Sequence, residues 1–544
     1  MLFQSRYFFI IFAILLSGCQ ENGQLDIYLQ TNRQSSSLNP LKNNSTRFLN
    51  LKIKQDNQEF NYSTPLEPGE TLNFGNLATG SFDSIHISSS TINGVLTGYG
   101  TLEKDFKLLE DQPVSLTVPF RYPFTYLTGN TNLEVFHPFL ETGVTTNPIQ
   151  LGNFNYHSSG VALSHDGIML LATAYSEVES TAKIFGLHTI DHTKVVEINF
   201  ESDHPFTKVT ISPDDQVAAL YNPEGNKIIF VNLPDFFNQD VQAYSSIEFA
   251  NPAAVVFASK NRAYALSSTG YSHSTCSQQT TSSVSGINLP SGLNSSSTPE
   301  IFPLISNSNY IASILLWNNQ ESLLMANPCE HEITITPIDE PQVSTFLNAT
   351  NLSPCLIPVH LLKNNKHLFT TCQSRADTIG NEWAPAKLII QRFNLDSPSN
   401  SASNPIILNY PREAFLYDAN MPDGSYLQLL QETEKVLPLA INLSVENNKI
   451  ILLTEAYYHS QPISISGGSL SELKRKSYSL IFLNPDSATI SRRFRPACYP
   501  VENEFDLSLP EEGLKNIYCA EMENVEIPPI SFIPVNISSL YGVK

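Results

Sequence analysis

The chain alternates between short apolar segments and tight polar turns, and one such unit recurs along most of its length. Residues 160–174, GVALSHDGIMLLATA, form an apolar run, a polar turn and a second apolar run. Apolar runs of about four to eight residues bounded by Asp, Gly and Ser clusters are typical of β-hairpins. The unit therefore predicts two antiparallel strands joined by a tight turn.

The same unit returns six more times. The further copies are Lys208–Pro223, Ala253–Ser268, Ile311–Pro328, Ile357–Cys372, Leu439–Ala456 and Phe505–Glu521. One turn residue per copy gives Asp166, Asp214, Lys260, Asn318, Asn364, Asn447 and Glu511, separated by 48, 46, 58, 46, 83 and 64 residues. A four-stranded propeller blade needs about 40–50 residues. The spacing predicts an all-β fold in which residues 124–544 form a seven-bladed β-propeller, with insertions in three blades.

The insertions and the closure of the ring can be placed on the sequence. We assign the insertions to Ser272–Ser297, Asp396–Glu434 and Ser460–Lys476, which are long polar or irregular stretches. Two expected strands, Asn132–His137 and Asn147–Leu151, have no inner hairpin of their own. A closed ring removes exposed edge strands, so we expect the start of this domain to complete the last blade.

The first part of the chain, residues 25–123, has a different pattern. Short strands alternate with Gly, Pro and Asn every eight to twelve residues or so, which predicts a β-sandwich. The expected strands are Leu25–Leu29, Phe48–Lys54, Glu70–Phe74, Ser84–Ser88, Gly94–Tyr99, Phe106–Leu108 and Val114–Phe120. Residues 118–129, VPFRYPFTYLTG, are too apolar for a free linker, and we place the domain junction there.

The N-terminus predicts export. Arg6 precedes ten apolar residues, Tyr7–Leu16, which are too few to span a bilayer as a helix. The following tetrad, LSGC, resembles the lipobox of bacterial lipoproteins. This resemblance implies a signal peptide over residues 1–18, lipidation of Cys19 and a lipidated tether over residues 19–24. Gln20 in place of Asp favours sorting to the outer membrane, and the alternative is a plain secretory signal with an unmodified Cys19.

Charge and cysteine content narrow the possible partners. The net charge of −21 argues against nucleic acid, because phosphate binding needs clustered Lys and Arg. Six cysteines remain after Cys19, and an even number in an exported protein suggests disulfides. The candidates are Cys276, Cys329, Cys355, Cys372, Cys498 and Cys519. Pairing of nearest neighbours is the simplest arrangement, and free buried thiols are the alternative.

Two further resemblances concern the fold. SPDDQVAALY, followed by KIIFVNLPD, resembles the blades of YVTN-type and lactonase-like seven-bladed propellers, in which Pro and Asp or Gly shape an "SPDG" turn. Ser164–Gly167 and Ser212–Asp215 match that turn. Residues 69–88, GETLNFGNLATGSFDSIHIS, are similar over a short stretch to prealbumin-like β-sandwiches, which implies an accessory module. Both resemblances bear on fold rather than on activity.

The sequence singles out no catalytic residue, metal ligand or cofactor. G-x-S-x-G, H-E-x-x-H and Walker motifs are absent. The cluster Cys329–Glu332 (CEHE) is the best metal candidate, but adjacent strand residues point to opposite faces. We therefore predict a lipid-anchored, non-catalytic scaffold of the bacterial cell envelope. We expect its inserted loops to bind an envelope protein or a polysaccharide. The alternatives are a propeller enzyme (a lactonase-like hydrolase or a quinoprotein) and a component of surface adhesion or gliding machinery.

Overall fold

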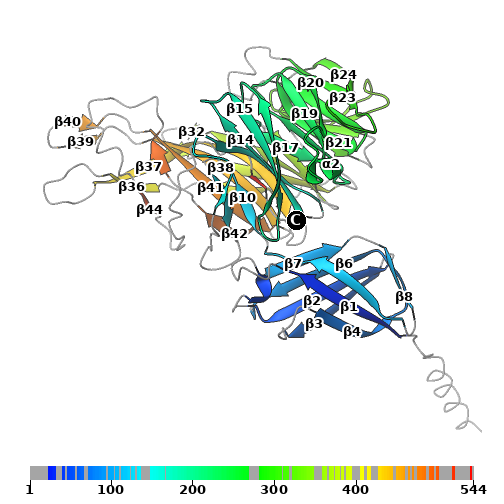
Figure 1. Ribbon diagram of the computed structural model, residues 1–544. Helices are drawn as coiled ribbons and strands as arrows, with labels where there is room; N and C mark the ends of the chain where they lie inside the picture. The colour runs from blue at the N-terminus through cyan, green and yellow to red at the C-terminus, as the bar shows by residue number, and fades with distance from the viewer. Residues whose placement is uncertain are drawn as a thin grey trace, which may run out of the picture. The chain divides into compact units, whose positions relative to one another are not determined.

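The fold is described from a computed structural model, and almost every element in it is a strand (Figure 1). The structure describes residues 22–541, except for residues 32–38, 43–45, 56–57, 66–70, 93–95, 103–104, 110–111, 123, 129–131, 137–147, 166, 269–280, 309, 318–321, 348–357, 364–366, 373, 376, 380–381, 385–386, 395–404, 410–412, 418–426, 445–448, 460–462, 466–467, 471–473, 485–488, 495–497, 501–517 and 521–539. Within this range, no helix combines the length and the hydropathy needed to cross a bilayer.

The chain divides into two compact units, one made mainly of residues up to Pro123 and the other of residues from Phe124 onward. In the first unit the strands are β1 (Asn22–Gln30), β2 (Phe48–Gln55), β3 (Gln58–Pro65), β4 (Thr71–Ala78), β5 (Gly80–Phe82), β6 (Ser84–Ser90), β7 (Leu96–Leu102), β8 (Phe106–Leu108) and β9 (Val114–Pro119), with one 3-10 turn, η2 (Pro40–Lys42). They form sheets in the orders β3-β2-β6-β7 and β4-β1-β9 and a β5-β8 pair. Strand β1 begins at Asn22, inside the expected tether, and β3 has no counterpart among the strands expected from the sequence.

One apolar core lies in this first unit, and both of its larger sheets contribute to it. Alternate residues of β1, such as Ile27, and of β2, such as Leu51, are buried in the same cluster as Ile87 of β6 and Val118 of β9. Strand alternation explains the pattern, because successive side chains point to opposite faces of a sheet. The intervening polar residues therefore remain at the surface.

The second unit is a β-propeller built from successive four-stranded antiparallel sheets. Blade II contains β13 (His157–Leu163), β14 (Met169–Ser176), β15 (Thr181–His188) and β16 (Lys194–Glu201), and blade III contains β17 (Lys208–Ile211), β18 (Val217–Tyr221), β19 (Lys227–Asn232) and β20 (Tyr244–Glu248), with helix α2 (Leu233–Phe237) before β20. Blade IV contains β21 (Pro252–Ser259), β22 (Arg262–Ser267), β23 (Ser282–Asn288) and β24 (Glu300–Ser308), and blade V contains β25 (Ser313–Trp317), β26 (Ser322–Asn327), β27 (Glu332–Pro337) and β28 (Thr345–Leu347).

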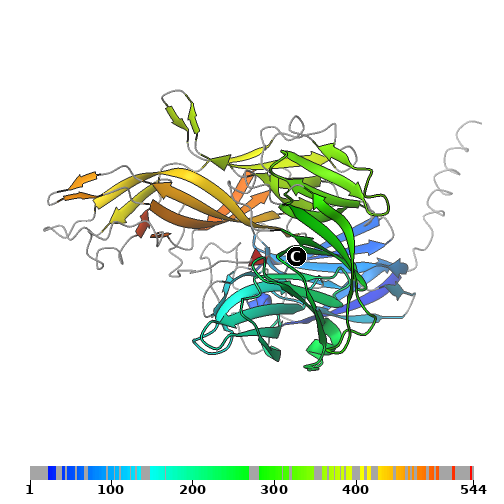
Figure 2. The same cartoon turned by 90° about the horizontal axis from the view of Figure 1, so that it is seen from above.

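The later blades carry additional strands. Blade VI contains β29 (Pro358–Lys363), β30 (His367–Cys372), β34 (Lys387–Asn394) and β35 (Ile406–Asn409), with the short strands β31 (Ser374–Arg375), β32 (Asp377–Ile379) and β33 (Glu382–Ala384) inserted between β30 and β34. Blade VII contains β37 (Leu427–Ser444), β38 (Lys449–His459), β41 (Lys474–Asn484) and β42 (Thr489–Phe494), extended by β36 (Glu413–Tyr417), β43 (Cys498–Pro500) and β44 (Tyr518–Ala520) and by the hairpin β39 (Ile463–Ile465)–β40 (Gly468–Leu470). Its long strands, yellow to orange in Figure 2, run out beyond the ring.

Both ends of the propeller sequence meet in blade I, which closes the ring. Its sheet has the order β12 (Ile149–Gln150), β11 (Asn132–Phe136), β10 (Thr125–Leu127) and β45 (Leu540–Tyr541). The inner strands adjoin one another in the cycle β45, β13, β17, β21, β25, β29, β37 and back to β45. Over the described residues this gives seven blades, as predicted, and the expected pairing of the first strands with the end of the chain is confirmed.

Three details of the sequence prediction are wrong. Asp396–Glu434 is not simply an insertion, because it contains β35, the fourth strand of blade VI, and the first residues of β37. Ser272–Ser297 is not simply an insertion, because Ser282–Asn288 within it is the third strand of blade IV and pairs with both β22 and β24. The last repeat, Phe505–Glu521, was expected to supply the inner hairpin of the blade that closes the ring, blade I. Its described residues, Tyr518–Ala520, pair instead with β36, and β45 takes the inner position.

Neighbouring blades share apolar cores, which explains the composition of the second strands. All five residues of β18 are buried, because its sheet is covered on both faces by adjacent blades. Ala218 packs in the cluster shared with blade II, and Ala219 packs in the cluster shared with blade IV. A strand buried on both faces reads as a continuous apolar run rather than an alternating one.

Candidate functional site

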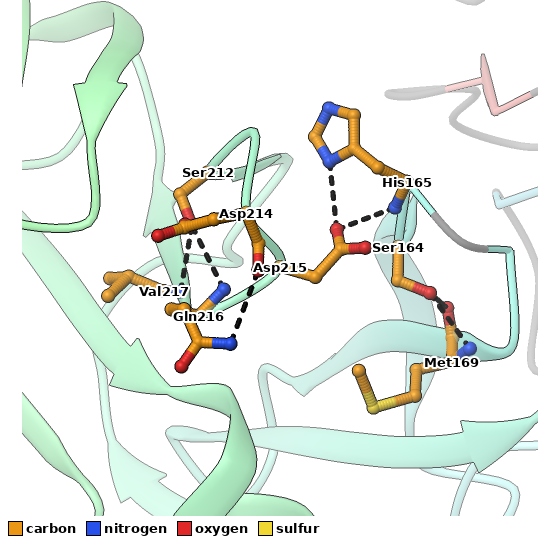
Figure 3. A network of polar contacts seen from close by, with 8 residues as sticks. All are labelled: Ser164, His165, Met169, Ser212, Asp214, Asp215, Gln216 and Val217. Carbon is orange, nitrogen blue, oxygen red and sulfur yellow. Dashed lines mark hydrogen bonds and ion pairs between the residues drawn. The ribbon is translucent and has the colours of Figure 1, made fainter. Parts of the chain in front are cut away.

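The two turns that match the "SPDG" pattern use the same local design (Figure 3). In the first, the Ser164 hydroxyl accepts a hydrogen bond from the Met169 backbone N–H at 2.9 Å. In the second, the Ser212 hydroxyl accepts from the backbone N–H groups of Gln216 at 3.1 Å and Val217 at 2.9 Å. Each turn also needs one left-handed residue, which is Gly167 in the first, with φ +68°, and Asp215 in the second, with φ +55°. Gly and Asp are among the residue types that tolerate this conformation best.

A carboxylate joins these two turns across the boundary between blades II and III. Asp215 Oδ1 accepts the backbone N–H of His165 at 2.6 Å and lies 2.8 Å from His165 Nδ1 (Figure 3). The side chain of Asp215 is 15% exposed and that of His165 is 33% exposed. Partial burial strengthens such a charge-assisted contact relative to one in bulk water. We call this contact the His165–Asp215 latch.

The latch continues into a series of loop contacts on the same end of the blades. Within blade III, the Leu233 N–H donates to the Gln216 carbonyl at 2.9 Å. Between blades III and IV, the Ser295 N–H donates to the Gln242 carbonyl at 3.0 Å, and the Ser245 hydroxyl donates to the Ser297 carbonyl at 2.6 Å. These bonds connect turns from three successive blades. We refer to the series from His165 to Ser297 as the turn belt.

Whether the His165–Asp215 latch could take part in catalysis depends on the hydrogen bonds of the neighbouring serines. A carboxylate that holds an imidazole by one nitrogen is the arrangement of an oriented general base or metal ligand. The two nearby serines, however, close their own turns: Ser164 donates to the Met169 carbonyl at 3.1 Å and Ser212 donates to Asp214 at 2.7 Å. Neither hydroxyl is directed to His165. The arrangement therefore serves to fix two blades together.

Replacing Asp215 tests the latch. In Asp215→Ala both contacts to His165 are lost and a non-Gly residue without a polar side chain occupies φ +55°, so we expect a loss of about 2 kcal/mol of stability. In His165→Ala the backbone contact remains, and we expect about half that loss. Urea midpoints measured on both variants check this order, and equal losses in the two would contradict the assigned role of the backbone bond.

A second polar cluster lies at the opposite end of blade II, around Glu179. The Tyr156 hydroxyl donates to Glu179 Oε2 at 2.7 Å, and Asn153 and Asn155 also hydrogen bond to this carboxylate. The bond from Tyr156 is the largest cause that holds the pKa of Glu179 below its usual value. Lys183 Nζ lies 4.5 Å from the centre of the Tyr156 ring and bonds to Glu197 at 2.8 Å. We call these residues the Glu179 cluster.

The ion pairs of Glu197 predict a pH dependence. Burial raises the pKa of Glu197, but hydrogen bonds from Lys183 and Lys194 and their charges outweigh it, so the pKa lies below the ordinary value. A lowered carboxylate pKa stabilises the fold above the unfolded pKa of about 4.3, and this contribution disappears as pH falls through the folded pKa. We expect Glu197→Gln to lose about 0.5–1 kcal/mol at pH 7 and little at pH 3. Thermal midpoints at both pH values, compared with wild type, test this.

The predicted cysteine sites are only partly described. Cys19, Cys276 and Cys355 lie outside the described residues, so lipidation and most of the pairing remain predictions. Cys329 and Cys372 are each disulfide-bonded. Cys498 lies on β43 and Cys519 on β44, and four strands separate these two in the sheet order. These two cysteines therefore do not lie on neighbouring strands, contrary to the simplest expectation, and their pairing stays a prediction.

The CEHE segment does not assemble a metal site. His331 lies in a tight turn with φ +57°, and the Glu332 carboxylate accepts hydrogen bonds from Asn327 across the hairpin and from Thr334 on the same strand. The pKa of Glu332 is raised, and burial of its carboxylate is the largest cause. No group of three or more metal-ligating side chains occurs in the part of the chain that the structure describes.

Sequence reasoning missed the Glu179 cluster. Its members come from the β12–β13 connection and the β14–β15 turn, which no motif relates to one another. One signal was present: Phe154 and Val178 are single apolar residues within otherwise polar turns, Asn153–Asn155 and Glu177–Glu179. An apolar residue at such a position has no local structural reason.

Fold and site together define the class of the main unit: a closed seven-bladed β-propeller in which turns of blades II, III and IV are joined by hydrogen bonds. No protein-family model matches the sequence, and no curated protein matches it. Among solved structures, a protein of unknown function from Desulfotomaculum acetoxidans is 14% identical, with 64% of this chain and 94% of that chain covered and a TM-score of 0.39.

Two other propeller domains are similar at a comparable level. The Cps50 (Swd1) β-propeller domain of Myceliophthora thermophila is 12% identical, with 63% of this chain and 97% of that chain covered and a TM-score of 0.35. The C-terminal WD40 domain of Sif2 is 11% identical, with 62% and 77% covered and a TM-score of 0.34. At such distances the blade topology described above, rather than these likenesses, defines the fold.

Proposed function

We propose that this protein is a lipid-anchored, non-catalytic binding protein of the bacterial cell envelope, and that its propeller holds an envelope protein or a glycan. The observation that carries the proposal is the turn belt, which joins three successive blades through the His165–Asp215 latch and the Gln242–Ser295 contact. Loops fixed in this way form a preorganised surface, and preorganisation lowers the entropy lost on binding.

Additional surface comes from the insertions of blades VI and VII. The strands β36 and β37 pair antiparallel, from Tyr417–Leu427 to Glu413–Gln431. The strand β36 extends the sheet of blade VII, and β32–β33 and β39–β40 form separate two-stranded hairpins, so all of them add structure beyond what ring closure requires. Irregular additions on a rigid scaffold are where recognition is usually located.

The proposed location rests on the N-terminal sequence. The LSGC tetrad supports lipidation at Cys19, and Gln20 after it supports the outer membrane. Two or more acyl chains anchor a protein stably, at about 0.8 kcal/mol per buried methylene. Metabolic labelling with radioactive palmitate should label the wild type and not Cys19→Ser, and the unlabelled variant should leave the membrane fraction. Labelling that survives in Cys19→Ser would overturn the anchor.

One observation favours the alternative of a propeller enzyme. The imidazole of His165 is held by a carboxylate at Nδ1, as in many hydrolases. The decisive experiment on the purified protein combines elemental analysis, absorbance spectroscopy and ester and lactone hydrolysis assays. We expect no stoichiometric metal, no redox absorbance and no hydrolysis. We also expect a discrete envelope protein or glycan to co-purify. Stoichiometric metal, a redox chromophore, or hydrolysis that is lost in His165→Ala would overturn the non-catalytic role.

A further inference from the structure

Two apolar side chains protrude from the end of blade II that lies opposite the turn belt. Val178 is 82% exposed and Phe154 is 81% exposed, the highest values for large apolar side chains in the described part of the chain. Phe154 lies three residues before His157, Val178 lies three residues after Tyr175, and His157 pairs with Tyr175 in the β13–β14 ladder. The register therefore brings the two loops together. We call this pair the Phe154–Val178 knob.

The Glu179 cluster holds the knob in place. Phe154 stands between Asn153 and Asn155, both of which hydrogen bond to the Glu179 carboxylate, and Val178 immediately precedes Glu179. The turn that carries Phe154 is itself closed, because the Asn155 N–H donates to Asn153 Oδ1 at 2.9 Å and the Tyr156 N–H donates to the Asn153 carbonyl at 3.1 Å. Both apolar side chains are thus presented from backbone that is fixed by hydrogen bonds.

A rigid, exposed Phe is unfavourable for an isolated protein and useful for a complex. Leaving such a side chain in water forgoes about 2 kcal/mol that burial would provide. Aromatic anchors that enter a pocket of a partner contribute a large share of binding energy, and a preorganised anchor loses little entropy. Exposed apolar residues grouped on neighbouring loops mark interaction surfaces.

The charges around the knob indicate what kind of surface it meets. Glu177 and Glu179 flank Val178 in the sequence. Burial is the largest cause that raises the pKa of Tyr175, and the charges of Glu177 and Asp203 raise this pKa further, so Asp203 also lies near this loop. Lys183, a nearby cation, is paired with Glu197 and also interacts with Glu179, which leaves Glu177 and Asp203 in excess. The rim is therefore acidic, within a chain of net charge −21. Like charge disfavours a second copy of this chain and an anionic membrane surface.

We propose that the Phe154–Val178 knob inserts into an apolar pocket of a protein partner whose pocket rim carries Lys and Arg. This inference rests on the proposed binding role and names the partner class and the contact surface for it. The apolar pair supplies affinity, and the acidic rim supplies orientation and a fast encounter with a basic surface.

The test begins with the photoreactive amino acid p-benzoylphenylalanine at position 154 of the full-length protein in its own cells. The matched control carries it at position 343, where Val343 is 58% exposed in the β27–β28 connection. We expect one discrete adduct from position 154 and none of that size from position 343. Mass spectrometry of the adduct should identify a protein segment rich in Lys and Arg. An adduct with a second copy of this chain, with lipid, or with nothing would overturn the inference.

The identified partner is then purified and its affinity is measured against three variants. Phe154→Ser should weaken binding at least about tenfold, Glu177→Lys should weaken it severalfold and reduce its salt dependence, and Val343→Ser should leave it unchanged. Thermal midpoints establish that each variant is folded. If the partner binds all variants equally, the Phe154–Val178 knob is not the contact surface, although the proposed binding function still holds. If no envelope protein or glycan binds the wild type, the proposed function fails as well.

Discussion

Deletion of residues 538–544 is expected to open the propeller ring and to leave the protein prone to aggregation. Strand β45 pairs with β10 and adjoins the inner strands β13 and β37, so it is the only contribution of the chain end to blade I in the described structure. Without it, β10 becomes an unpaired edge with free N–H and C=O groups. We expect a loss of about 3–5 kcal/mol, the range of severe single lesions, and association of the opened chains.

The matched control for this deletion removes only residues 542–544, which leaves β45 in place. Urea midpoints and size-exclusion profiles of the two truncated proteins provide the comparison. A protein lacking residues 538–544 that remains monomeric, with the midpoint of the wild type, would contradict closure of the ring through β45.

Substitution of Phe230 by Ala is expected to be the most destabilising point change in the boundary between blades III and IV. Phe230 of β19 is fully buried, and its ring meets that of Phe257 of β21 edge to face with centroids 6.3 Å apart. Both rings belong to one apolar cluster that spans the two blades. Removing a buried Phe side chain costs about 3–5 kcal/mol through lost burial and the remaining cavity.

Phe154→Ala is the matched control, because it makes the same chemical change at a side chain that is 81% exposed. We expect it to change the urea midpoint by no more than about 0.5 kcal/mol. A large loss for Phe154→Ala would mean that this side chain is buried in solution and would contradict the exposed knob, whereas a small loss for Phe230→Ala would contradict the blade core.

The hairpin repeat was readable from the sequence because each inner hairpin is a local structure. The turns Ser164–Gly167 and Ser212–Asp215 close through bonds between residues at most five positions apart, so their residue types report their geometry directly. Apolar runs on both sides follow from burial between blades, as in β18. Six of the seven expected hairpins, from β13–β14 to β37–β38, are therefore present at the predicted places.

The prediction failed where a strand depends on partners distant in sequence. Ser282–Asn288 (SSVSGIN) has the composition of a loop, yet β22 and β24 pair with it on both sides and Gly286 accommodates the ring of Phe302. Close packing of that ring against the Gly286 Cα replaces the apolar side chain that the pattern lacks. The spacing of the repeats assigned the inner strand of the closing blade, blade I, to Phe505–Glu521. In the structure Leu540–Tyr541 takes this inner position by pairing with β10.

By itself, the sequence determined the all-β class, the repeat, the closure of the ring and the absence of any recognisable catalytic motif, because periodicity and turn chemistry are local properties. Only the tertiary structure decided which turns meet. The His165–Asp215 latch joins residues 50 positions apart, and the Glu179 cluster joins Tyr156 to a carboxylate 23 positions away. Such contacts depend on the register of strands and on the placement of neighbouring blades, and no short-range pattern of residues encodes either of them.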